Sequence, residues 1–205
     1  IVQQVLTPLL PEFLNAWPAI SVHVMATNRR VDLIREGIDL ALRVRTKLDT
    51  DAEFVVRRLG TASAYLVASP TYLQRHGTPG TPQELSAHTT LSFNDPQIDV
   101  RWTLLNNHGE EEHITVQPQL SSNDFLVLTE AAVQGRGIAL LPSVATQEEQ
   151  RRGQLVQVLP QWRSPEGIVH CIYPSRRGMI PAVRTLLDFL CERMSPHYQP
   201  RDTTL

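Results

Sequence analysis

The residues of this sequence that could carry out chemistry are not spaced for catalysis. The seven histidines are scattered, and His108 and His113 fall near a predicted turn, so no local spacing supplies convergent metal ligands. Gly135 and Gly137 lack the third glycine of a dinucleotide-binding fingerprint and precede a predicted strand where the fingerprint needs a helix. No G-x-S-x-G and no Walker sequence occurs. The sequence therefore predicts no enzyme, no metal site and no cofactor.

Polar groups suited to binding recur where predicted strands give way to helices. Thr27 and Asn28 precede one predicted helix, and the segment 122–124 precedes another. Helix N-termini present free backbone N–H groups and favour anions. Arg43 ends a strand, and open α/β sheets gather ligand contacts at such ends. Each has a structural alternative, because the first two segments can act as helix caps and Arg43 can pair with an aspartate. Their shared placement favours a ligand cleft and a carboxylate or another anion.

The elements that must position these groups begin with an apolar helix. Its apolar residues, over 5–17, step by one and three and lie on one helical face. An alternating segment at 20–25 predicts a strand, 31–36 predicts a helix that ends at Gly37, and 38–43 predicts a second strand. Strand, helix and strand in this order predict a βαβ unit and a parallel sheet.

The rest of the chain alternates between short strands and helices, without a flexible linker or an internal repeat. A hairpin turn is predicted at 106–109, and Asp124 is one of the capping residues that open an apolar helix over 125–133. Further strands are predicted at 54–59, 64–68, 90–93, 101–105, 113–116, 138–141, 155–159 and 168–173, and further helices at 71–76, 83–87 and 180–194.

The composition is that of an ordinary globular protein, and its charge gives no reason to expect a nucleic-acid partner. Hydrophobic residues make up 41% of the 205 residues, and the formal net charge is −2. A domain that grips DNA by itself normally shows a basic excess. Only two cysteines occur, which predicts reduced thiols in a reducing compartment. No apolar run reaches the roughly 18 residues of a membrane span.

Four blocks of sequence, in order, resemble the effector-binding region of LysR-type transcriptional regulators. The second contains the Arg43 strand and the fourth contains the Gly135–Gly137 turn. The blocks lie at 7–18, 31–43, 66–85 and 131–142, and the likeness extends to about Met194. Each block is weak alone, but the ordered set is specific to the family.

The resemblance implies a two-lobed α/β fold like that of type 2 periplasmic binding proteins, with two crossing segments between the lobes. We expect residues 1–68 and 175–194 to form lobe I, residues 69–174 to form lobe II, and residues 195–205 to form a C-terminal tail. The expected hinge residues are Ala68, Ser69, Pro70, Tyr173, Pro174 and Ser175.

The resemblance also implies a function, in which a small-molecule effector binds in the cleft between the lobes. The expected effector contacts are Thr27, Asn28, Arg43, Phe93, Asn123 and Asp124. The parent protein would be cytoplasmic and form a homodimer or homotetramer, with the helices over 5–17 and 125–133 as candidate contact surfaces. It would bind DNA only through a helix-turn-helix region absent from this chain, and it would not bind a membrane.

One departure and one alternative accompany this hypothesis. The family's domain usually opens with a strand and a polar loop, whereas this chain starts at Ile1 beside the first helix. We therefore expect a fragment whose cleft lacks one wall. The alternative is a periplasmic solute-binding protein of the same fold, and an upstream signal peptide instead of a helix-turn-helix would favour it.

Overall fold

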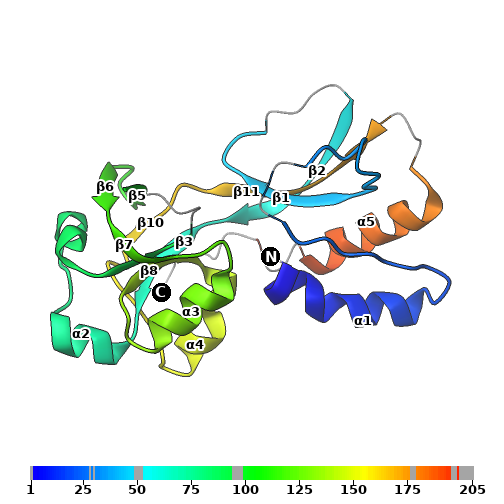
Figure 1. Cartoon of the computed structure of the whole chain (residues 1–205). Helices are drawn as coiled ribbons and strands as arrows, with labels where there is room; N and C mark the ends of the chain where they lie inside the picture. The colour runs from blue at the N-terminus through cyan, green and yellow to red at the C-terminus, as the bar shows by residue number, and fades with distance from the viewer. Residues whose placement is uncertain are drawn as a thin grey trace. The chain divides into compact units, whose positions relative to one another are not determined.

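The structure, a computed structural model, describes residues 2–27, 29, 31–48, 53–93, 99–175, 179–194 and 198. The chain forms two compact units (Figure 1). Unit 1 comprises Ile1–Ala62 and Glu166–Leu205, and unit 2 comprises Ser63–Pro165. The chain therefore passes from one unit to the other twice, as the sequence predicted, and each unit has its own sheet.

Unit 1 contains a three-stranded antiparallel sheet. Its strands are β1 (Ala41–Arg45), β2 (Phe54–Ala62) and β11 (Gly167–Pro174), in the order β1-β11-β2. Both β1 and β2 pair antiparallel with β11. The prediction of a parallel βαβ unit in this region was wrong. The partner of β1 comes from the far end of the chain, and no local pattern indicates a pairing over that distance.

The segment between α1 and β1 explains the error. Residues 20–27 form no strand, and Val24 and Met25 are exposed. Alternation alone does not make a strand, because a strand also needs a hydrogen-bonded neighbour. The helix predicted at 31–36 is a turn in which the Glu36 N–H donates to the Asp32 carbonyl at 3.0 Å and the Ile38 N–H donates to the Leu33 carbonyl at 2.9 Å.

Helices α1 (Thr7–Ala16) and α5 (Pro181–Met194) supply the apolar packing of unit 1. A short π-helix, η1 (Val2–Leu6), leads into α1. Phe13 is fully buried, and its ring lies 4.8 Å from that of Trp17 and 5.3 Å from that of Phe189. The predicted apolar face of the first helix therefore packs against the last helix, and Figure 1 shows the two side by side.

Unit 2 contains a mixed eight-stranded sheet in the order β6-β5-β10-β3-β8-β4-β7, with β9 paired to β3. Strand β4 is parallel to both β7 and β8, whereas the other pairings are antiparallel. The strands are β3 (Ala64–Ala68), β4 (Thr90–Ser92), β5 (Val100–Asn106), β6 (Glu111–Val116), β7 (Pro118–Ser121), β8 (Ile138–Pro142), β9 (Val156–Gln157) and β10 (Trp162–Arg163).

Helices cover this sheet and enclose two apolar clusters. Helix α3 (Phe125–Val133) has the predicted bounds and carries the chain from β7 to β8. It packs on a cluster that includes Val67, Leu91 and Leu141. Leu66, Trp102 and Trp162 belong to the second cluster. The remaining helices are α2 (Pro70–His76), α4 (Gln147–Arg151) and the 3-10 segments η2 (Pro82–Ala87) and η3 (Ser143–Ala145).

The two boundaries between units come earlier in the chain than the sequence predicted. Ala68 ends β3 inside the sheet of unit 2, Ser69 caps α2 and Pro70 is the first residue of α2. Tyr173 and Pro174 lie in β11 of unit 1, and Ser175 donates to the Glu53 carbonyl. The first three predicted hinge residues therefore lie in or directly beside elements of unit 2. The last three lie in or directly beside elements of unit 1. The breaks in the sequence pattern at Pro70 and Pro174 lie at the ends of strands β3 and β11. Each of these strands begins shortly after the chain has crossed from one unit to the other, so the crossing precedes the strand.

Candidate functional site

The carboxyl ends of parallel strands β4 and β7 meet at one edge of the sheet in unit 2. Ser92 pairs with Ser121 across the two strands. The Ser122 N–H donates to the Ser92 carbonyl at 3.1 Å, and the Trp102 Nε1–H donates to the Ser92 hydroxyl at 3.3 Å. Parallel strands place their carboxyl ends at the same edge, where open α/β folds gather ligand contacts. This edge is therefore built of polar groups held in fixed positions.

Helix α3 begins at the same edge, and its N-terminus is capped as the sequence predicted. The Asp124 Oδ1 accepts the Leu126 N–H at 2.8 Å, and the Ser122 hydroxyl oxygen accepts the Asp124 N–H at 3.0 Å. Asn123 is exposed. A capping carboxylate satisfies one of the helix's open N–H donors. Asp124 thus has a clear structural role, and a contact between Asp124 and an effector stays a prediction.

An aromatic pair lies beside these polar groups. The rings of Phe93 and Phe125 are stacked, with centroids 4.1 Å apart and an interplanar angle of 27°. Both side chains are half-buried and pack against the cluster under α3. The structure therefore brings three predicted effector residues of unit 2 together at one edge, namely Phe93, Asn123 and Asp124. It adds Phe125, which the sequence indicated only as a helix residue.

The predicted contacts of unit 1 lie at and around the segment 27–31. Thr27 is exposed, and its Oγ1 accepts the Arg29 N–H at 3.3 Å. The Arg43 Nη2 donates to the Val31 carbonyl at 3.2 Å. Asn28 falls outside the described residues. Arg43 thus ties strand β1 to the segment that carries Thr27, which is a structural role beside the predicted effector contact.

An exposed ion pair holds the same segment. Arg29 donates two hydrogen bonds to the carboxylate of Glu36, one of them from Nη1 at 2.8 Å. These hydrogen bonds lower the pKa of Glu36, against a smaller opposing effect of desolvation. Bidentate pairs of this kind fix geometry as well as charge. The pair therefore connects the turn at 32–37 to Arg29, which lies two positions after Thr27.

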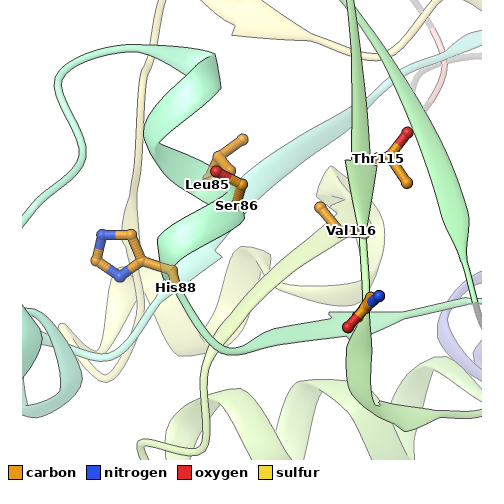
Figure 2. Close-up of a pocket in the computed structure, with 6 residues that line it drawn as sticks. Leu85, Ser86, His88, Thr115 and Val116 are labelled. Atoms are coloured by element: carbon orange, nitrogen blue, oxygen red, sulfur yellow. The ribbon is translucent and has the colours of Figure 1, made fainter.

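A hollow of about 380 Å³ opens elsewhere on unit 2, between η2 and β6. Figure 2 shows Leu85, Ser86 and His88 on one side of it and Thr115 and Val116 on the other. Burial lowers the pKa of His88, the charge of His76 lowers it further, and Glu84 opposes both. None of the predicted effector residues lines this hollow, so it is separate from the strand-end edge.

Unit 1 contains a smaller hollow of about 280 Å³ between its sheet and α5. Arg57 and Tyr173 line it from the sheet, and Arg184 and Asp188 line it from the helix. Cations and a carboxylate thus share this surface. In the described ranges, no group of three or more His, Cys, Asp or Glu side chains could hold a metal ion.

Sequence reasoning missed two residues at the strand-end edge of unit 2. Arg163 and Tyr65 are directly paired across β10 and β3, and the Nε atom of Arg163 is buried without a hydrogen-bond partner among the residues that the structure describes. Strand β10 has only two residues, which is too short for any periodic pattern. The sequence around Arg163 offered no more than a tryptophan before it and Ser164 and Pro165 after it.

Comparisons with known proteins agree on the family. The LysR substrate binding domain matches residues 1–195. The transcriptional regulator DmlR of Escherichia coli K12 is 33% identical over 198 residues, which cover 96% of this chain and 63% of DmlR. The probable regulator LtrA of Klebsiella pneumoniae is 32% identical over 192 residues, which cover 92% of this chain and 61% of LtrA. The chain spans about three fifths of the length of such curated relatives.

Solved structures give the same result. The full-length virulence activator AphB of Vibrio cholerae superposes with a TM-score of 0.81 at 27% identity, over 96% of this chain and 65% of AphB. The regulatory domain of CrgA from Neisseria meningitidis gives 0.79 at 28% identity, over 93% of this chain and 92% of that domain. Such regulatory domains have the two-lobed α/β fold of type 2 periplasmic binding proteins, so the predicted fold class is confirmed.

Proposed function

Because the chain belongs to the LysR family of transcriptional regulators, as its substrate-binding domain, we propose that it senses a small-molecule effector. The observation that carries this proposal is the strand-end edge of unit 2, where capped helix α3, the Phe93–Phe125 stack and the serines of β4 and β7 meet. Polar groups held by such a scaffold are preorganised for a ligand. Thr27 and Arg43 are the proposed contacts from unit 1.

The proposed role involves binding without turnover. The relatives are named as transcriptional regulators, and a regulator needs only a ligand that favours one arrangement of the protein over another. This supports the regulator over the alternative of a periplasmic solute-binding protein. We propose that the whole protein acts on DNA through a helix-turn-helix region outside this chain. Relatives are named HTH-type regulators, and the chain's own net charge of −2 provides no basic surface excess.

We also propose that the protein is cytoplasmic and forms a homodimer or homotetramer. The outer faces of two helices supply apolar surface for this. Leu126 and Val127 on α3 are 59% and 46% exposed, and Leu14 on α1 is 40% exposed. Exposed apolar groups clustered on one element mark interaction surfaces more often than chance. No helix within the described ranges is long and apolar enough to cross a bilayer.

A thermal-shift screen tests effector sensing. A ligand present at about 100 times its Kd stabilises the folded state by about 2.7 kcal/mol, which is easily measured. Arg43→Ala should lose this stabilisation, because its guanidinium is a proposed contact. Arg45→Ala is the matched control, since Arg45 is exposed two residues along the same strand. Equal stabilisation of all three proteins would count against Arg43, and a broad metabolite screen that stabilises none of them would count against sensing altogether.

A further inference from the structure

The hollow between the sheet of unit 1 and helix α5 is lined by charged side chains of both signs. Arg57 and the hydroxyl-bearing Tyr173 line it from the sheet. Arg184 and Asp188 line it from α5. Among the residues that the structure describes, none forms an ion pair or a side-chain hydrogen bond with any of these four side chains. The three charged residues are exposed and Tyr173 is half-buried, so a ligand in solution can reach them.

Strand pairing places this hollow on the opposite face of the sheet from Arg43. Arg57 pairs with Cys171, whereas Arg43 pairs with the neighbouring His170. Directly paired residues share a face of a sheet, and consecutive residues of a strand point to opposite faces. Arg57 and Tyr173 thus project toward α5, and Arg43 projects away from it. None of the predicted effector residues lines the hollow, so it is separate from the proposed effector site.

The two charges on α5 gain little from the helix that carries them. Arg184 and Asp188 lie one turn apart, and the arginine comes first. An acidic residue four positions before a basic one pairs better than the reverse order. Arg184 is also the fourth residue of α5, in the first turn, where the helix dipole disfavours a cation. The helix therefore carries an arginine that does not stabilise it, which favours a role in contact with a ligand.

Unpaired charges of both signs in one hollow match a ligand that also carries both. A planar guanidinium binds a carboxylate through two parallel N–H···O bonds, and Arg57 and Arg184 each supply one, beside the Tyr173 hydroxyl. The Asp188 carboxylate repels a simple carboxylic acid in its ionised form, but it accepts hydrogen bonds from an ammonium group. An amino acid satisfies both requirements in one small molecule.

The apolar part of the lining and the size of the hollow narrow the ligand class further. Buried Leu187 and half-buried Met179 complete the lining. At about 280 Å³, the hollow is smaller than most pockets for drug-sized ligands, which span roughly 300–1,000 Å³. We propose that this hollow binds a small amino acid with an apolar side chain, as a second ligand site separate from the effector site. Arg57 and Arg184 hold the carboxylate, and Asp188 holds the ammonium group.

Calorimetric titration of the chain with three ligands of similar shape tests the proposal. Leucine carries both charges, isocaproate lacks the ammonium group, and isoamylamine lacks the carboxylate. Leucine should bind at least about tenfold more tightly than either, equal to about 1.4 kcal/mol. Arg184→Gln should weaken leucine binding by a similar factor. Asp188→Asn should weaken leucine binding but strengthen isocaproate binding, because it removes a repulsive charge. Damage to the fold would weaken both.

A matched control comes from the other face of the same strand. Arg58 is exposed, follows Arg57 and pairs with His170, so it points away from the hollow. Arg58→Gln should bind leucine as the wild type does. Ligand-free Arg184→Gln should unfold at the same urea concentration as the wild type or at a higher one, because it removes a cation from the first turn of α5. A clear loss of stability would assign Arg184 to the fold and overturn the proposal.

The position of the bound ligand separates this site from the effector site. In a ¹H–¹⁵N correlation spectrum, leucine should shift the amide signals of Arg57, Arg184 and Leu187. Shifts at Phe93 and Asn123 instead would place leucine at the effector site and overturn the second site, while effector sensing stands. The proposal is also overturned if leucine, valine and methionine all fail to bind, if the three leucine-shaped ligands bind equally, or if both α5 variants leave leucine binding unchanged.

Discussion

Replacement of Tyr72 by phenylalanine should destabilise unit 2 through one hydroxyl group. Tyr72 is 2% exposed, and its oxygen accepts the Thr89 N–H at 3.0 Å and lies 3.2 Å from His88 Nδ1. The hydroxyl therefore hydrogen-bonds to both neighbours, and the tautomer of the imidazole sets which atom donates between Tyr72 and His88. Phenylalanine keeps the ring, which stacks on His76 at 4.6 Å, and removes only these two hydrogen bonds.

The size of the effect follows from what the change leaves unpaired. The Thr89 N–H loses its acceptor in a half-buried position, and a donor left without a partner costs about 1–3 kcal/mol. We expect a loss of about 1.5 kcal/mol. With a urea dependence of about 2 kcal/mol/M, the unfolding midpoint should fall by about 0.8 M.

Tryptophan fluorescence provides the assay, because Trp102 and Trp162 are both buried in unit 2. Tyr65→Phe is the matched control. Its hydroxyl has no hydrogen-bond partner among the described residues, so the ligand-free midpoint should not move. The reasoning is refuted if Tyr72→Phe unfolds within about 0.2 M of the wild type, or if Tyr65→Phe loses as much stability as Tyr72→Phe.

Two further predictions concern the same part of unit 2. The pKa of His88 is held below its usual value of 6.5 by burial and then by His76, so the unfolded chain binds more protons near that pH. This contribution to stability is complete above about pH 6.5 and is lost as the pH falls through the lowered pKa. Urea unfolding midpoints measured from about pH 5 to about pH 8 should therefore fall toward the acid end. In His88→Gln the midpoint should depend less on pH. An unchanged slope in His88→Gln would contradict the assignment. Gly137→Ala should cost about 2–3 kcal/mol, because the added Cβ would lie 2.5 Å from the Thr89 carbonyl oxygen, which also accepts the Ile138 N–H. Gly80→Ala is the control, since its nearest contact would be 3.8 Å away, and equal midpoints for the two variants would argue against the close approach.

Cys171 is a free thiol in the interior of unit 1. The thiol is fully buried in β11, and desolvation, followed by the charge of Cys191, raises its pKa to about 12. The thiolate is the reactive form of cysteine. Cys171 is therefore a packing residue under ordinary conditions.

Local sequence determined the elements whose signals are local. The helix at 125–133 was predicted with its bounds, because Asp124 caps one end and the turn at Gly135 follows the other. The turn at 106–109 forms because the Asn106 Oδ1 accepts the N–H groups of His108 and Glu110, each at 2.9 Å. The family itself was also readable, since four ordered blocks identify it without any knowledge of contacts.

Only the tertiary structure decided which distant segments pair. The sequence of 20–25 alternates like a strand but has no ladder partner among the described residues, whereas β1 pairs with a strand more than a hundred residues away. Strand β10 is too short to show a pattern, and it exists because β5 and β3 flank it. Strand pairing and burial depend on neighbours that a local pattern does not contain. For the same reason the sequence selected Arg43 for the effector, and only the folded structure shows that the Arg43 guanidinium donates to the Val31 carbonyl.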